Sequence, residues 1–111
     1  MNKREDIYVM FYYNNEPTFV KMIGEILPED NTLAIVKHTQ RFEWQIIDVA
    51  SGYVVLRSGL RYGKTKKHLY AAILHLLKDE EFIKKLEIAR NTKTYKRVCS
   101  LLEATKNASK I

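Results

Sequence analysis

The clearest chemical feature of the sequence is a short segment that is dense in cations. It contains Arg57, Arg61, Lys64, Lys66 and Lys67. Guanidinium and ammonium groups this close together suit phosphate binding, because phosphate contacts supply most of the sequence-independent affinity for nucleic acids. Tyr62 lies among these cations and offers a ring for stacking on a base or packing beside the loop. The segment predicts a nucleic-acid contact, and the alternative is an ordinary solvated surface, on which lysines are common.

The same segment partly matches the phosphate-binding P-loop, G-x-x-x-x-G-K-[ST]. Gly63, Lys64 and Thr65 fit the end of the motif, but Ser58 stands where its first glycine belongs. No strand is predicted after the following helix, so the parallel sheet that frames a P-loop cannot form. We therefore expect a plain strand-to-helix loop in which the glycines, Gly59 and Gly63, adopt positive φ.

Other arrangements of reactive side chains are weak. His68 and His75 are seven residues apart on a predicted helix, and no acid lies at metal-ligand spacing from them. Cys99 with His38 would make a nucleophile and a base, but nothing around Cys99 marks an oxyanion hole, and isolated cysteines are more often structural. The sequence predicts a protein that is not an enzyme and that uses no metal or cofactor.

Five segments show the composition of β-strands and are separated by turn residues. They span about residues 7–13, 18–27, 32–38, 42–49 and 53–57. The first turn is expected at residues 14–17, where Pro17 lacks the N–H that a ladder needs. Connections this short make neighbouring strands antiparallel, because parallel pairing needs a crossover of a dozen or more residues. The sequence predicts an α+β fold built on an antiparallel meander of about five strands.

Two or three helices follow the strands and are expected to pack on one face of the sheet. They span about residues 65–78, 80–90 and 94–106, and a single bent helix over 80–106 remains an alternative. Thr65 is the predicted N-cap of the first helix. The predicted core joins alternate residues of the fourth strand to the apolar stripe of that helix. Its members are Phe42, Trp44, Ile46, Leu69, Ile73, Leu76 and Leu77.

Length and charge narrow the class of protein. The 111 residues fit one domain, 1–111, and the apolar runs are too short to span a membrane. The single cysteine excludes an internal disulfide and, without a recognisable signal peptide, predicts a cytoplasmic protein. Residues 1–50 carry five Lys/Arg against eight Asp/Glu, whereas residues 51–111 carry fourteen against five. The basic second half favours an anionic partner.

One family resemblance covers roughly residues 32–78. Trp44 lies in one strand, Gly52 at a hairpin turn, Gly59 after the next strand, and Thr65 opens an Ala/Leu-rich helix. This order resembles the three-stranded-sheet-plus-helix DNA-binding modules, the arm-type domain of phage and transposon integrases and its AP2-like relatives. In that family the helix backs the sheet while the exposed sheet face enters the major groove. The resemblance implies DNA contacts from Lys37, Arg41, Gln45, Arg57, Arg61 and Lys64.

Two functions are compatible with these patterns. The first is a small basic nucleic-acid-binding accessory protein, of phage or mobile-element origin, that holds phosphates with its cationic segment. The second is a protein–protein interaction module or small inhibitor that docks through an aromatic N-terminal hairpin. That hairpin carries Tyr8, Phe11, Tyr12, Tyr13 and Phe19. The two functions are separated by whether the face with Tyr8, Met10 and Tyr12 is exposed to solvent while the Arg57–Lys67 loop is left unpaired with acids.

Overall fold

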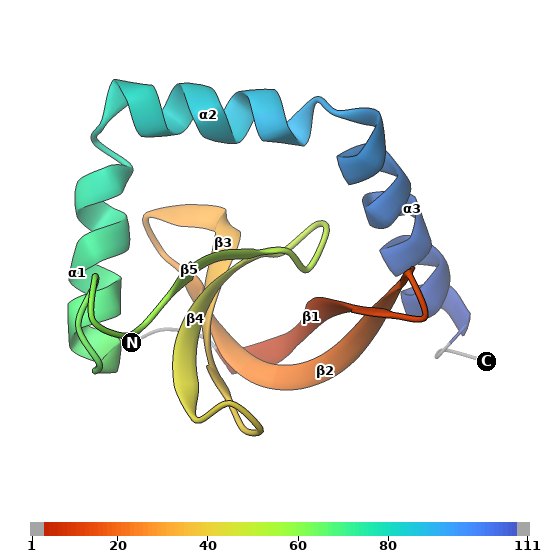
Figure 1. Cartoon of the computed structure of the whole chain (residues 1–111), viewed down its shortest axis with the longest axis horizontal. Helices are drawn as coiled ribbons and strands as arrows, with labels where there is room; N and C mark the ends of the chain where they lie inside the picture. Colours follow the sequence, from red (N-terminus) through yellow and green to blue (C-terminus); the bar gives the residue numbers. More distant parts are fainter. Residues whose placement is uncertain (1–3, 109–111) are drawn as a thin grey trace.

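A computed structural model, in which residues 4–108 are described, shows a five-stranded antiparallel sheet followed by three helices (Figure 1). The strands follow one another in the sheet in chain order and are β1 (Arg4–Tyr13), β2 (Glu16–Leu27), β3 (Asp30–His38), β4 (Glu43–Asp48) and β5 (Val54–Arg57). The helices are α1 (Lys66–Leu76), α2 (Glu80–Arg90) and α3 (Lys93–Ala108). The predicted α+β meander is confirmed, and residues 80–106 form two helices. The ends of the predicted domain, 1–3 and 109–111, lie outside the described residues.

The first hairpin turns more tightly than predicted. Asn14 and Asn15 have φ of 51° and 64°, so these two residues form the turn by themselves. Asparagine tolerates this left-handed conformation, which a two-residue hairpin requires at both positions. The predicted turn over residues 14–17 is longer than the observed one, because Pro17 already lies in β2 and pairs with Tyr12. Proline is tolerated there because β3 pairs only with the C-terminal part of β2.

The sheet curls, because one of its faces buries side chains from every strand. This inner cluster consists of Ile7, Val9, Met22, Ala34, Val36 and Ile47, with Val54 packed against it. The curl brings β1 back to the turn before β5, where the Met10 N–H donates to the Gly52 carbonyl at 2.8 Å. Gly52 has φ of 80°, and a Cβ there would lie 3.0 Å from the Met10 nitrogen, so glycine permits the approach. The sheet is therefore a partly closed barrel with an inner and an outer face.

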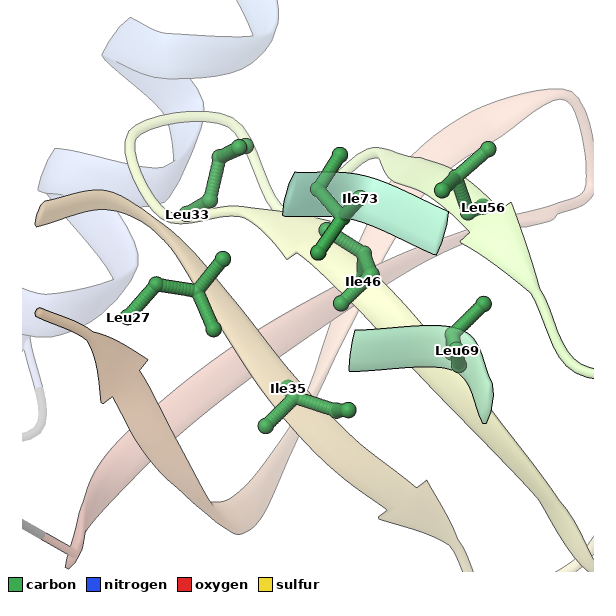
Figure 2. Packing of buried hydrophobic residues seen from close by; sticks show 7 residues of the cluster. All are labelled: Leu27, Leu33, Ile35, Ile46, Leu56, Leu69 and Ile73. Carbon is green, nitrogen blue, oxygen red and sulfur yellow. The ribbon is translucent and has the colours of Figure 1, made fainter. Parts of the chain in front are cut away.

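Helix α1 packs on the outer face of the sheet. Figure 2 shows the strand residues of this cluster, Leu27, Leu33, Ile35, Ile46 and Leu56, around the helix residues Leu69 and Ile73. The Thr65 hydroxyl accepts from the His68 N–H at 3.1 Å, which confirms the predicted N-cap. Trp44, Leu76 and Leu77 are partly buried against the cluster, as part of the predicted core.

Phe42 is a correction to that predicted core. Its side chain is 83% exposed, and its φ of 53° places it in the turn that precedes β4. The Phe42 N–H donates to the His38 carbonyl at 2.8 Å, which closes the turn. The strand is thus shorter than predicted, because this hydrogen bond turns the chain before the alternation of β4 can begin.

The three helices follow one another around three sides of the sheet (Figure 1). Helix α2 has no buried residue, whereas α3 buries Val98 and Leu102. The Asp79 carboxylate caps α2 by accepting from the Glu81 N–H at 2.9 Å. No helix within residues 4–108 combines the length and the apolar character needed to cross a membrane.

A buried carboxylate ties the helices to the sheet. Asp48, at the end of β4, is 3% exposed. It accepts from Ser51 Oγ at 2.6 Å, from Arg90 Nη2 at 2.7 Å and from the Tyr95 hydroxyl at 2.8 Å. Because these donors come from the β4–β5 turn, α2 and α3, one side chain joins three parts of the fold. Burial and the hydrogen bond to Asp48 raise the pKa of Tyr95, so this phenol stays a donor.

Ion pairs between the two halves of the chain absorb part of the charge asymmetry. They join Lys66 to Glu25, Arg57 to Glu43 at 3.6 Å, Arg90 to Asp48 at 2.7 Å and Arg97 to Glu16 at 3.1 Å. Within residues 4–108, no ion pair uses the five acids of the basic half, namely Asp79, Glu80, Glu81, Glu87 and Glu103. The acidic first half is therefore a docking surface for the basic second half.

The packing of α1 can be tested by truncating Ile73, which is fully buried. Ile73→Ala should lower the free energy of unfolding by about 2–5 kcal/mol, because it removes buried methyl groups and leaves a cavity. Urea denaturation measures the change. The matched control is Ile88→Ala on α2, where the side chain is 70% exposed and the change should stay within about 0.5 kcal/mol. Equal effects of the two substitutions would contradict this packing.

A second prediction about stability concerns Asp48 and its hydrogen-bond donors Ser51, Arg90 and Tyr95, which together form the Asp48 node. Asp48→Asn keeps the shape but removes the charge, so the free energy of unfolding should fall by about 1.5–3 kcal/mol, the range for hydrogen bonds to charged groups. Glu87→Gln removes an exposed charge from α2 and should change it by less than about 0.5 kcal/mol. Guanidinium chloride is unsuitable because its salt screens charges, so urea unfolding is the measurement. An Asp48→Asn variant as stable as the wild type would show that the node is dispensable.

Candidate functional site

A cavity of about 600 Å³ opens where the barrel fails to close. Strands β1 and β5 are the two edges of the sheet, and beyond the Met10–Gly52 hydrogen bond no backbone hydrogen bond joins them within residues 4–108. The cavity occupies the space between them. Phe11 and Tyr12 contribute from β1, and Arg57 from the end of β5. The incomplete closure of the sheet is thus what makes the site.

Polar side chains replace apolar ones at this end of the inner face. His38, Glu43, Gln45 and Arg57 share the face, because His38 pairs with Glu43 and Gln45 pairs with Arg57 in the strand register. Gln45 Nε2 donates to Glu43 Oε2 at 2.8 Å, and Arg57 Nη1 lies 3.6 Å from the same oxygen. Gln45 is 1% exposed, so a polar amide is held inside the barrel.

His38 is held as a neutral ring beside this amide. It is 9% exposed, and its Nδ1 accepts from the Arg41 backbone N–H at 3.2 Å. Burial lowers the pKa of His38, and the charges of Arg41 and Arg57 act in the same direction while Glu43 opposes them. Because Nδ1 is an acceptor, the proton of the neutral ring lies on Nε2. His38 can therefore donate one hydrogen bond within the cavity that it lines.

Aromatic rings and a second arginine surround the mouth. Phe11 and Tyr12 are 44% and 56% exposed, and both line the cavity. The Tyr12 hydroxyl lies 3.3 Å from the Tyr53 hydroxyl. Burial, followed by this hydrogen bond, raises the pKa of Tyr53 to about 12, so its phenol stays neutral. Arg41, an exposed residue of the β3–β4 turn, also lines the cavity. The site combines two guanidinium groups with accessible rings.

The structure divides the predicted nucleic-acid-binding residues into separate groups. Arg41 and Arg57 lie at the cavity. Lys37 and Lys66 lie over the Trp44 ring, at 5.7 and 5.5 Å from its centroid. Trp44 belongs to the outer face, so these two lysines are on the opposite side of the sheet from the cavity. Lys66 is also the residue that pairs with Glu25.

The remaining predicted residues belong to the loop before α1 or to its first turn. The Arg61 guanidinium lies 5.4 Å from the Tyr62 ring centroid, and Lys64 and Lys67 are exposed. Gly59 and Gly63 have φ of 149° and 83°, as expected for this loop. The loop begins directly after Arg57, so its cations lie next to one end of the cavity along the chain.

The sequence reading did not assemble the cavity itself. The sequence suggested His38 only as a base for Cys99, and Gln45 only as a DNA contact implied by the family resemblance. The alternation of residues along β4 could have predicted it. This alternation sets Gln45 on the same face of the strand as Ile47, which belongs to the inner cluster. Cys99 lies on α3, and burial raises the pKa of its thiol, which disfavours the reactive thiolate. Residues 4–108 contain no cluster of three or more His, Cys, Asp or Glu side chains suited to a metal ion.

Comparison of the chain with protein-family models, with curated proteins and with solved structures found no match. The function is therefore argued from the cavity and its surroundings.

The neutral state of His38 predicts a pH dependence of stability. The unfolded chain protonates this ring near pH 6.5, whereas the folded chain resists protonation until a lower pH. The unfolded state then binds more protons, so stability should fall as the pH drops below 6.5 towards the lowered pKa. Urea unfolding at several pH values measures this loss.

The control for that experiment is His38→Asn, whose Oδ1 can take the place of Nδ1 as the acceptor for Arg41. The variant should lose less stability between pH 7.5 and pH 5 than the wild type, because His68 and His75 are unchanged in both proteins. Identical pH profiles would refute a neutral, buried His38.

Proposed function

We propose that the protein binds single-stranded nucleic acid in the cavity between β1 and β5. One observation carries the proposal: two arginines and two exposed aromatic rings surround the same concavity. These residues are Arg41, Arg57, Phe11 and Tyr12. Aromatic rings stack on bases of any sequence, while cations follow the phosphate backbone. Arginine adds a planar fork that matches a phosphate and also stacks on rings.

A concave site favours an unpaired strand over a duplex. A duplex keeps its bases stacked inside and offers mainly its backbone and groove edges, whereas an unpaired strand can turn a base into a cavity. Phe42 adds a further ring next to Arg41, since it is 83% exposed in the same turn. The loop that follows Arg57 supplies Arg61 and Lys64 for neighbouring phosphates. The predicted cationic segment thus extends the cavity instead of forming the site alone.

Protein–protein interaction through the hairpin is the second candidate function. It is favoured by the exposure of Phe11, Tyr12 and Tyr13, the last of which is 65% exposed, at the end of an edge strand. The preceding part of the hairpin is less accessible. Met10 is 8% exposed, and Lys106 of α3 lies over the Tyr8 ring at 5.7 Å. Two of the exposed rings, Phe11 and Tyr12, line the cavity, which is why nucleic acid is the leading proposal.

Strand binding can be measured by fluorescence anisotropy with a labelled mixed-sequence oligonucleotide. The affinity should fall with salt, and the slope of log K against log salt should be about −0.7 for each phosphate contact with a single strand. Replacing Arg41 and Arg57 together by alanine should flatten that slope by about 1.4, because two contacts are lost. A duplex of the same sequence should bind more weakly than the single strand.

The matched control replaces Lys84 and Lys85 by alanine, since both are exposed on α2 and neither lines the cavity. This variant has the same loss of net charge and should keep the wild-type slope. Equal slopes for the two double variants would show that net charge, not the cavity, binds the strand. Absence of any complex at tens of micromolar protein and low salt would overturn the proposal in favour of the interaction module.

A further inference from the structure

One buried polar atom of the cavity wall lacks a protein partner. Gln45 Oε1 is the buried side-chain nitrogen or oxygen that receives no hydrogen bond within residues 4–108. The Nε2 of the same amide is already engaged with Glu43, so the acceptor is the free end. Leaving a buried acceptor unsatisfied is destabilising, and such atoms are rare in folded proteins. Gln45 lines the cavity, so a rotation about its soft terminal torsion would turn Oε1 toward a donor there, in exchange for the Nε2–Glu43 hydrogen bond.

A donor lies beside this acceptor. In the register of β3 and β4, His38 pairs with Glu43, so it is the diagonal neighbour of Gln45 on the same face. Diagonal neighbours have Cβ atoms roughly 7–8 Å apart, within reach of a shared ligand for long and aromatic side chains. The Nδ1 of His38 is occupied by the Arg41 N–H, which leaves Nε2–H as the donor. Once the Gln45 amide has turned, the wall presents an acceptor from Gln45 next to a donor from His38.

The base-pairing edges of these four bases fall into two groups, of which one matches an acceptor beside a donor and the other does not. Cytosine and adenine present an amino group, which donates, beside a ring nitrogen, which accepts. Uracil and thymine present a carbonyl, which accepts, beside an N–H, which donates. Against Gln45 Oε1, the second arrangement would set oxygen against oxygen. Proteins that take an unstacked base into a pocket read it by this edge and by stacking on aromatic rings.

We propose that the cavity binds one unpaired base with an amino group beside a ring nitrogen, Gln45 accepting from the amino group and His38 donating to the nitrogen. The inference rests on the proposed function and adds a base preference to it. Phe11 and Tyr12 supply the rings at the mouth, and Arg57 lies next to Gln45 in the register, where a phosphate attached to the bound base can meet it. The ligand is a cytosine or adenine nucleotide, either within a strand or free.

The test compares oligo(dC) with oligo(dU) of equal length, because cytosine and uracil have the same ring size and differ at this edge. The wild type should bind oligo(dC) about 3- to 10-fold more tightly, the factor expected of one net hydrogen bond. In Gln45→Met, which keeps the length of the side chain, the ratio should fall to about one through loss of oligo(dC) affinity. Oligo(dU) affinity should not change. Asn107→Met, on the exposed last turn of α3 and outside the cavity lining, is the control and should retain the preference.

The outcomes separate this inference from the proposed function. Equal binding of both oligonucleotides, with a salt slope that still depends on Arg41 and Arg57, would overturn the base preference and leave strand binding intact. No binding of either would overturn the proposed function. If Gln45→Met does not fold, the side-chain amide resonances of Gln45 in the wild type decide. They should shift with oligo(dC) and not with oligo(dU), and equal shifts would refute the assignment.

Free CMP and UMP distinguish the two sources of the base. Binding of CMP that is weaker than that of oligo(dC), but still preferred over UMP, supports a base within a strand. CMP that binds as tightly as oligo(dC) supports the base preference but makes the free nucleotide the ligand, which overturns strand binding. A preference for UMP would refute the inference in both forms.

Discussion

The buried carboxylate of Asp48 is the interaction on which the remaining architecture depends. Through Ser51 it shapes the β4–β5 turn, and the next residue of that turn, Gly52, accepts the hydrogen bond from Met10 that brings β1 to the other edge of the sheet. Through Arg90 and Tyr95 it anchors two helices that bury few side chains of their own. A charge this deeply buried is stable only when its donors are all in place. Closure of the sheet and docking of the helices are therefore coupled at one side chain.

The same closure explains why there is a cavity. A fully closed barrel of five strands would fill its interior with side chains, and the apolar part of the inner face does so. Beyond Met10 the edges diverge, and the inner face changes from apolar residues to Gln45, His38 and Arg57. Polar groups are tolerated inside because Gln45 donates to Glu43 and His38 accepts from the Arg41 backbone N–H. Among residues 4–108, Gln45 Oε1 is the buried side-chain atom left without a partner. The cavity and its polar lining thus lie at the point where the sheet stops closing.

The uneven distribution of charge along the chain is partly balanced by ion pairs between its two halves. The cations that follow residue 50 partly neutralise acids of the N-terminal strands, as Lys66 does with Glu25. Such pairs orient the helices more than they stabilise them when they are as exposed as Arg97 and Glu16. Arg41 and Arg57 keep cations at the cavity, and the loop between β5 and α1 exposes Arg61 and Lys64. The positive charge of the protein is therefore a mixture of internal docking and of surface that remains available to an anion.

The sequence alone determined what depends on neighbours along the chain. Alternation and short turns predicted five antiparallel strands, and helical spacing with Thr65 as a cap predicted α1, because these signals act over a few residues. The prediction that Phe42 is buried was wrong, because its burial depended on where the turn before β4 closes. Only the tertiary structure decided that β1 returns to Gly52, that Lys37 and Arg41 lie on opposite faces, and that His38 and Gln45 share a cavity. Those outcomes follow from the curl of the sheet and from contacts between residues some forty positions apart, such as Met10 and Gly52, and no local pattern encodes them.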